Sequence, residues 1–309
     1  MSASSFLVAS LGAEVAIPTD IRQHMALPSE HVGQERRAVD AAKELVLELR
    51  GIDLSFGGVV ALENIDLAVQ QGEILGIIGP NGAGKSSLIN VISGVYRPDR
   101  GHVAINSKAY RPVPTEKLAS LGVARTFQNL ALFKGLSVLD NVATGRAYAE
   151  RANFLSQIAG LPSARREQAD ARERAGRIID FLHLTPHVDR LAGTLPYGLQ
   201  KRVELARALA AEPRILLLDE PMAGMTATEK NELADYVRLA RDEYAVTVVL
   251  IEHDIGVVMG LSDRIAVLDY GRKIADGTPA EIASDQRVID AYLGAAPETK
   301  TGRVSDGCV

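Results

Sequence analysis

Alternating apolar and polar residues predict strands in the first patterned part of the chain. In ELVLELRGIDLSF, residues 44–56, leucines recur at every second position, which is the spacing of a β-strand. The segment LENIDLAVQQGEILGIIG, residues 62–79, continues the strand pattern and ends in an apolar run typical of a buried strand, and HVAIN, residues 102–106, adds another. These strands look antiparallel, and they flank a glycine-rich turn at residues 79–87.

The pattern changes twice further along the chain. Between about residues 130 and 191 the strand pattern is absent and mainly helical segments are predicted, which indicates a helical subdomain. Strands then alternate with helices: RILLLDE, a helix over about residues 226–243, TVVLIEHD, a short helix, DRIAVLDYG, and short helices up to residue 294. Such alternation predicts a parallel sheet whose carboxyl strand ends hold a ligand. The predicted fold class is therefore α/β, with a mostly parallel sheet, an antiparallel β subdomain and a helical subdomain.

The two ends of the chain have no such pattern. In residues 1–43, prolines and a glycine interrupt any periodicity, so we expect a disordered N-terminal extension. Residues 295–309 are expected to form a flexible C-terminal tail. The predicted folded domain is residues 44–294.

Composition and charge narrow the class of protein. The 309 residues are 47% hydrophobic and 24% charged, which is ordinary for a soluble globular protein. The only cysteine, Cys308, excludes a disulfide framework and favours a reducing, cytosolic compartment. No apolar run approaches the about 20 residues that span a bilayer. A formal net charge of −5 gives no general attraction for nucleic acid, so nucleic acid is not a predicted partner.

The stretch GPNGAGKSS predicts a site for phosphate groups. It joins a buried strand to a helix, and its glycines allow successive backbone N–H groups to surround an anion at the helix N-terminus. Lys85 adds a full positive charge, and the hydroxyl of Ser86 is suited to hold Mg²⁺ on the phosphates of ATP. The predicted nucleotide-binding residues of this loop are Gly79, Pro80, Asn81, Gly82, Ala83, Gly84, Lys85, Ser86 and Ser87.

Acidic and histidine residues follow the later apolar strands. Asp219 and Glu220 come directly after Ile215 to Leu218, where two adjacent carboxylates are costly without a cation nearby. Asp219 is predicted to hold magnesium through its water shell, and Glu220 to polarise the water that attacks the γ-phosphate. His253 follows the strand VVLIE and is predicted to hydrogen-bond that water or the phosphate.

Two further residues have weaker sequence signals. Gln128, in RTFQNL, offers an amide that can ligate magnesium or hold the attacking water. Phe56, before two glycines, is predicted either to stack on adenine or to belong to the core.

Together these motifs resemble the ATPase subunits of ABC transporters. GPNGAGKSS, TFQN, LPYGLQKRVELARAL, ILLLDEP and IEHD occur in the order and spacing of that family, over about residues 44–294. The forms ARTFQNLALFKGLSVLDNV and IEHDIGVVMGLSDRIAVLDYGRKIADGTPAEI look like the importers of branched-chain amino acids and related amides. The resemblance implies a peripheral subunit on the cytoplasmic face of a bacterial inner membrane. Its implied partners are a second ATPase subunit, the same or a sister chain, two permeases and, indirectly, a periplasmic binding protein.

The resemblance also assigns a role to LPYGLQKRVELARAL. In such ATPases the N-terminus of this helix faces the nucleotide held by the partner subunit, so Tyr197, Gly198 and Gln200 are implied nucleotide contacts. Pro196 stands where many relatives have serine, and Thr226 where aspartate or asparagine is common. Three alternatives stay open: the ATPase of a lipid or lipopolysaccharide exporter, a soluble ABC-type ATPase acting on nucleic acid or ribosomes, and a slowly hydrolysing regulator.

Overall fold

The computed structural model describes residues 44–126, 130–149 and 162–294. The predicted terminal segments and Gln128 lie outside these ranges. Within them, no helix has the length and apolar character needed to cross a bilayer.

A six-stranded sheet forms the centre of the fold, with the strand order β10-β9-β3-β8-β7-β6. Its strands run parallel except for β10, which pairs antiparallel with β9. Every residue of β3, β7 and β8 is buried, as expected from their apolar runs. The strands are β3 (Ile74–Ile78), β6 (Val123–Arg125), β7 (Ile215–Asp219), β8 (Thr247–Ile251), β9 (Arg264–Asp269) and β10 (Arg272–Gly277).

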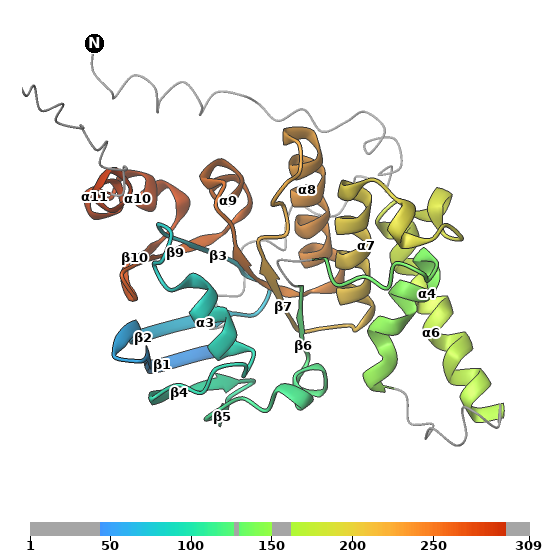
Figure 1. Ribbon diagram of the computed structural model, residues 1–309, viewed down its shortest axis with the longest axis horizontal. Helices are drawn as coiled ribbons and strands as arrows, with labels where there is room; N and C mark the ends of the chain where they lie inside the picture. Colours follow the sequence, from blue (N-terminus) through green and yellow to red (C-terminus); the bar gives the residue numbers. More distant parts are fainter. Residues whose placement is uncertain (1–43, 127–129, 150–161, 295–309) are drawn as a thin grey trace, which may run out of the picture. The chain divides into compact units, whose positions relative to one another are not determined.

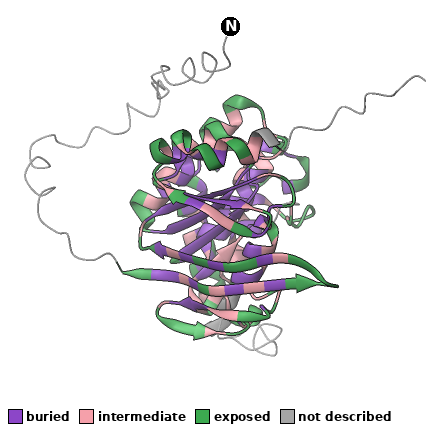
Figure 2. Cartoon of the chain, turned by 90° about the vertical axis from the view of Figure 1, so that its left-hand side faces the viewer, coloured by how far each residue is buried: buried purple, intermediate pink, exposed green. Residues whose placement is uncertain are grey.

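A second, antiparallel sheet has the order β2-β1-β4-β5. In β1 and β2, the two longest strands of the described chain, exposed residues recur between buried ones, so one face meets the core and the other meets solvent (Figure 2). The strands are β1 (Leu45–Phe56), β2 (Val59–Gln70), β4 (Arg100–Ile105) and β5 (Lys108–Tyr110). These two sheets confirm the predicted fold class.

The two faces of the central sheet pack against different elements. Ile215 and Leu217 of β7 belong to a core cluster with α3 (Lys85–Ile92) and the antiparallel sheet. Leu216 and Leu218 belong to a second cluster with α7 (Tyr197–Ala210) and α8 (Ala227–Tyr244). Because successive side chains of a strand point to opposite faces, α3 and α7 lie on opposite sides of the sheet (Figure 1).

The remaining helices surround these layers. A helical region next to α7 contains α4 and α6, and the chain closes with α10 and α11 beside β10. The bounds are α4 (Val138–Ala143), α6 (Pro162–Phe181), α9 (Ile255–Leu261), α10 (Pro279–Ser284) and α11 (Gln286–Gly294), with short 3₁₀ turns at Thr115–Lys117, Ala119–Leu121, Thr144–Ala149, Thr185–His187 and Ala192–Thr194.

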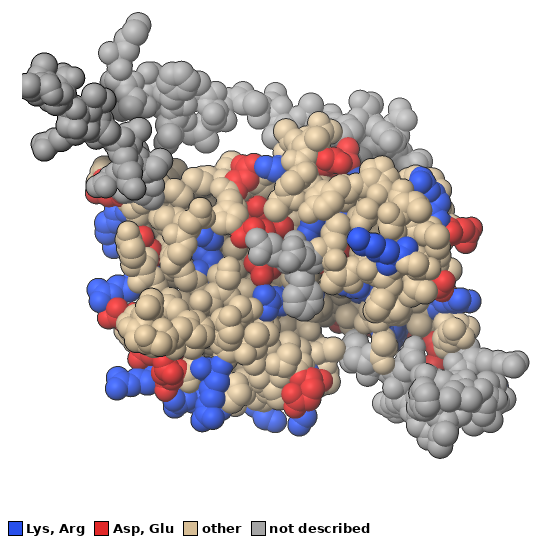
Figure 3. Space-filling view, in the orientation of Figure 1, with Lys and Arg blue, Asp and Glu red and all other residues tan. Residues whose placement is uncertain are grey.

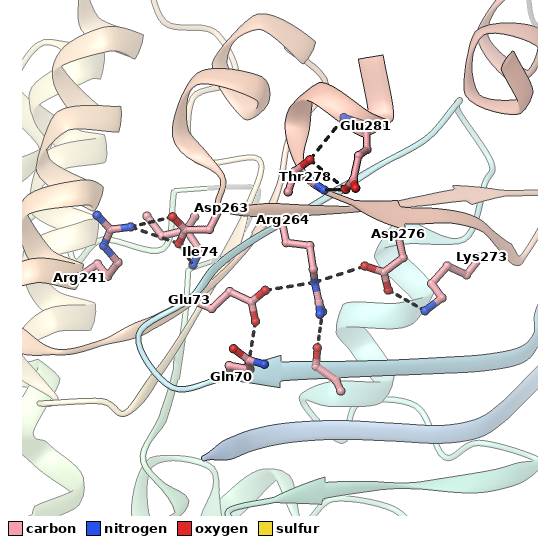
Figure 4. A network of polar contacts seen from close by, with 11 residues as sticks. Gln70, Glu73, Ile74, Arg241, Asp263, Arg264, Lys273, Asp276, Thr278 and Glu281 are labelled. Atoms are coloured by element: carbon pink, nitrogen blue, oxygen red, sulfur yellow. Dashed lines mark hydrogen bonds and ion pairs between the residues drawn. The ribbon is translucent and has the colours of Figure 1, made fainter. Parts of the chain in front are cut away.

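A polar network ties the two sheets together at the amino ends of the central strands (Figure 4). The Nε atom of Arg264 lies 3.1 Å from a Glu73 oxygen and 3.3 Å from an Asp276 oxygen. The same guanidinium donates to the carbonyl of Ala68 in β2. One side chain therefore joins strands of both sheets.

Candidate active site

The glycine-rich loop joins β3 to α3 through backbone that only glycine suits. Gly79 has φ +153, and a Cβ there would lie 2.1 Å from the carbonyl oxygen of Leu268. Gly84 caps α3 with φ +101, and its Cβ would lie 2.7 Å from the carbonyl oxygen of Ala61. The loop is thus shaped by close backbone contacts on both sides, and it ends at a helix N-terminus, where N–H groups favour an anion.

Lys85 lies inside this loop and is 6% exposed. Its Nζ donates to the carbonyls of Gly79 at 2.7 Å and Pro80 at 3.0 Å. Burial lowers the pKa of Lys85, while the Glu220 carboxylate raises it. Ser86 is exposed and Ser87 half-buried, so the Ser86 hydroxyl is accessible at the first turn of α3.

Two elements far along the chain support the loop. The N–H of Gly271, in the turn between β9 and β10, donates to the carbonyl of Ala83 at 3.0 Å. The phenol of Tyr292, in α11, is hydrogen-bonded to the backbone of Gly79, and burial raises the pKa of Tyr292. Sequence reasoning missed Tyr292, although its place in the amphipathic run VIDAYLG predicts a buried side.

The predicted acid and histidine lie together at the carboxyl ends of β7 and β8. Glu220 Oε1 is 2.5 Å from Nε2 of His253, and the N–H of Glu220 donates to the carbonyl of Ile251 at 2.9 Å. Glu220 has φ +50, a left-handed conformation that costs a non-glycine residue about 1–3 kcal/mol. Such strain persists only where surrounding contacts enforce it, which is common at functional sites.

Glu252, the residue before the histidine, was missed by sequence reasoning. It is 4% exposed, and its Oε1 and Oε2 accept the N–H groups of Met222 at 2.7 Å and His253 at 3.2 Å. Burial raises the pKa of Glu252, and these two N–H groups lower it. Glu252 thus links the turn after Glu220 to the histidine. Its only signal in the sequence is an acidic residue directly after an apolar strand.

Asp219 is 6% exposed and forms an ion pair of 2.9 Å with Arg125 at the end of β6. Arg125 was also missed, because a three-residue strand gives almost no sequence signal and a single arginine is equally compatible with a solvated charge. Asp219 and Ser86 supply carboxylate and hydroxyl oxygens, which are ligands that Mg²⁺ accepts, so these donors fit that ion.

The two residues with weaker sequence signals, Phe56 and Gln128, do not belong to this cluster of described contacts. Phe56 is 46% exposed and packs edge-to-face on Tyr96, with 5.0 Å between ring centroids. It is therefore not a core residue, and one side of its ring is accessible. Gln128 lies outside the described residues.

Tyr197, Gly198 and Gln200 lie at the start of α7, on the opposite side of the sheet from α3. Pro196 is the N-cap of α7 rather than a residue of its first turn. The Gln200 amide donates to the Leu195 carbonyl at 2.7 Å, and a Cβ on Gly198 would lie 2.2 Å from Oε1 of Glu229. One chain therefore does not bring these residues to its own phosphate loop.

A phosphate loop between a buried strand and a helix, with acidic residues at neighbouring strand ends, defines a nucleotide-hydrolysing α/β protein. Residues 62–223 match the family described as ABC transporter, and residues 272–298 match the one described as branched-chain amino acid ATP-binding cassette transporter. The chain belongs to the ABC transporter ATP-binding family. The predicted resemblance, and with it an ABC-type ATPase, is confirmed.

Relatives and solved structures agree with this membership. The high-affinity branched-chain amino acid transport ATP-binding protein BraF of Pseudomonas aeruginosa is 40% identical, over 81% of this chain and 98% of that protein. LivG of Escherichia coli strain K12, with the same description, is 38% identical over the same shares. An ATP-binding cassette of an ABC transporter in its ADP conformation has a TM-score of 0.71 and 32% identity, over 81% of this chain and 99% of that one.

Proposed function

We propose that this chain binds ATP and magnesium at the phosphate loop and hydrolyses ATP to drive import of branched-chain or other hydrophobic amino acids. The observation that carries the hydrolytic part is the 2.5 Å contact between Glu220 and His253, at the sheet end that also holds Lys85. In this proposal Glu220 orients and polarises the attacking water. His253 holds the Glu220 carboxylate in place and is assigned to hydrogen-bond the water or the γ-phosphate.

Binding of the nucleotide is assigned to the loop and its neighbours. Lys85 leaves its two carbonyl partners to meet the β- and γ-phosphates, and the backbone N–H groups of residues 79–87 surround them. The accessible side of Phe56 takes the adenine ring. Ser86 and Asp219, with Gln128, are the residues that would hold magnesium, which neutralises phosphate charge when bound.

A second ATPase subunit completes each site in this proposal. Tyr197, Gly198 and Gln200 lie on the far side of the sheet from their own phosphate loop, which supports a role in the site of a neighbouring subunit. Pro196 has no N–H group, but it is the N-cap of α7, so the free backbone N–H groups of the first turn belong to the residues that follow it and stay available to an anion. In this proposal the chain is bound at the cytoplasmic side of the bacterial inner membrane to two transmembrane permeases, which its conformational change drives, and a periplasmic binding protein delivers the cargo.

The cargo is inferred from the relatives. BraF and LivG are described as branched-chain amino acid transport proteins, and residues 272–298 match the C-terminal family of that name. A sulfate/thiosulfate import protein, CysA of Rhodopseudomonas palustris, is 34% identical over 85% of this chain and 73% of that protein. Amino acids are favoured because the identity is higher and the C-terminal match is specific to that group.

Nucleic acid is not favoured as a partner. On the face drawn in Figure 3, described Lys and Arg side chains are interspersed with Asp and Glu. A typical nucleic-acid interface is instead a continuous basic stripe.

The test is reconstitution of the full chain with its permeases and binding protein in liposomes. We expect ATP-dependent uptake of labelled leucine, no uptake of labelled sulfate, and loss of uptake in Glu220→Gln. Leucine uptake that does not require ATP would contradict the motor function, and sulfate uptake would contradict the cargo.

A further inference from the structure

Arg125 occupies an unusual position for a charged residue. It is the last residue of β6, the edge strand of the central sheet, and it pairs with Leu217 of the parallel strand β7. Its side chain is 11% exposed, and that of its partner Asp219 is 9% exposed. A nearly buried guanidinium therefore lies beside the end of β7. Its pairing partner, Leu217, is two residues before Asp219, the predicted magnesium ligand.

The guanidinium of Arg125 contacts two elements at once. One nitrogen donates to Oδ2 of Asp219 at 2.9 Å. The other donates to Oδ1 of Asn90 at 2.9 Å and to Oγ of Ser93 at 2.6 Å. Because the guanidinium is planar and rigid, it fixes the spacing between the carboxylate and α3.

The contacts on α3 lie on one side of that helix. Ser86 and Asn90 of α3 and its C-cap Ser93 are spaced at i, i+4 and i+7, and residues at this spacing share a helix face. Ser93 Oγ also donates to the carbonyl of Ile89 at 2.7 Å, so its oxygen is oriented to accept from Arg125. The face of α3 that begins at Ser86 is thus held against the end of β7.

We propose that Arg125 is a positioning residue of the magnesium site. It holds Asp219, through Oδ2, and the Ser86 face of α3 in a fixed relation, so that both can serve one shared cation. The inference rests on the proposed function, because it presumes that Ser86 and Asp219 serve magnesium. Arg125 itself touches neither nucleotide nor metal in this account.

The test compares affinities for a non-hydrolysable ATP analogue with magnesium and in EDTA, by calorimetry on the full chain. The ratio of the dissociation constant in EDTA to that with magnesium reports how much magnesium strengthens binding. Because magnesium binds the free analogue equally in every experiment, differences in this ratio between variants come from the protein. We expect Arg125→Met to reduce this ratio about tenfold and to change the affinity in EDTA less than twofold. Arg125→Lys should reduce this ratio about threefold. Its single ammonium group can replace the contact with Asp219 but not the contacts with Asn90 and Ser93 at the same time.

Two other variants make the result specific. Arg146→Met is the matched control, since Arg146 is 15% exposed and pairs with Glu212 at 2.9 Å outside the proposed site. Its ratio should equal that of the wild type. Asn90→Ala keeps the Arg125–Asp219 pair but removes one contact between Arg125 and α3, so it should reduce the ratio about threefold. If Arg125→Met does not fold, Arg125→Lys and Asn90→Ala still test the inference.

An unchanged ratio in the Arg125 and Asn90 variants would overturn the positioning role and leave the proposed function intact. An equal loss in Arg146→Met would also overturn it, because the effect would then be general destabilisation. If the wild-type chain shows no magnesium effect at all, the proposed magnesium site fails together with this inference.

Discussion

The two ends of the central sheet differ in the charged residues that they add to simple pairs and caps. At the amino ends, each labelled charge in Figure 4 caps backbone or pairs with another charge. Asp263 accepts the N–H of Ile74 at 2.8 Å and pairs with Arg241 at 3.1 Å. At the carboxyl ends, Glu220 is in a strained conformation, and Lys85 is buried against carbonyl oxygens.

This difference separates stability from function. The amino-end network stabilises the junction of the two sheets, because its opposite charges lie in ion-pair contact. The carboxyl end holds a lysine, a histidine and the carboxylates of Asp219, Glu220 and Glu252, and the arrangement of Lys85, Glu220 and His253 suits a phosphate chain and a water. Substitutions at the two ends should therefore change different measured quantities.

The largest effect is expected at Lys85. Lys85→Ala removes the charge that meets the phosphates, so ATP affinity should fall on the order of 100-fold or more, which is about 2.7 kcal/mol. Calorimetric titration with ATP measures this. Lys273→Ala is the matched control, since Lys273 pairs with Asp276 in the other network, and its ATP affinity should not change.

His253→Ala should act on turnover more than on binding. It removes the group 2.5 Å from Glu220, so kcat should fall by about 10- to 100-fold while KM stays within threefold. A steady-state phosphate assay gives both constants. A histidine that served only the fold would give an unchanged kcat in the folded variant.

Arg264→Met tests the opposite end of the sheet. The side chain is 27% exposed, and its loss leaves Glu73 and Asp276 without this partner, so we expect about 1–3 kcal/mol less unfolding free energy. Arg50→Met, at a side chain 63% exposed, should leave the unfolding midpoint unchanged, because exposed ion pairs contribute little to stability. Urea unfolding measures both, and kcat per folded molecule should be that of the wild type.

The smallest effect is expected at Tyr292. Tyr292→Phe removes one hydrogen bond to the Gly79 backbone, worth about 0.5–1.5 kcal/mol, so ATP affinity should fall by tenfold or less with little change in kcat. Tyr270→Phe is the control, because Tyr270 is 86% exposed. Equal affinities in the two variants would show that α11 does not support the loop.

Local sequence signals predicted the phosphate loop and the strands β3, β7 and β8, because glycine spacing and apolar runs are properties of neighbouring residues. The strands β5 and β6 were not predicted, since three residues at a sheet edge give almost no periodicity. Nor was β10 separated from β9, because a tight turn at Tyr270 and Gly271 joins them.

The missed site residues have a common reason. Arg125 meets Asp219, Glu252 meets Met222, and Tyr292 meets Gly79 only after distant segments come together. Their residue types alone are equally compatible with a solvated charge or a core aromatic. For Tyr197 and Gly198 the sequence signal came from family resemblance, and the fold adds that α7 faces away from its own phosphate loop.

The most direct test of the account is phosphate release by Glu220→Gln at saturating magnesium and ATP, with ATP affinity measured on the same protein. The account predicts an affinity within threefold of the wild type and release slowed at least about 100-fold, because the polarising carboxylate is lost while the phosphate loop is unchanged. Release within tenfold of the wild-type rate would contradict the assignment of Glu220, and with it the proposal that ATP is hydrolysed at this end of the sheet.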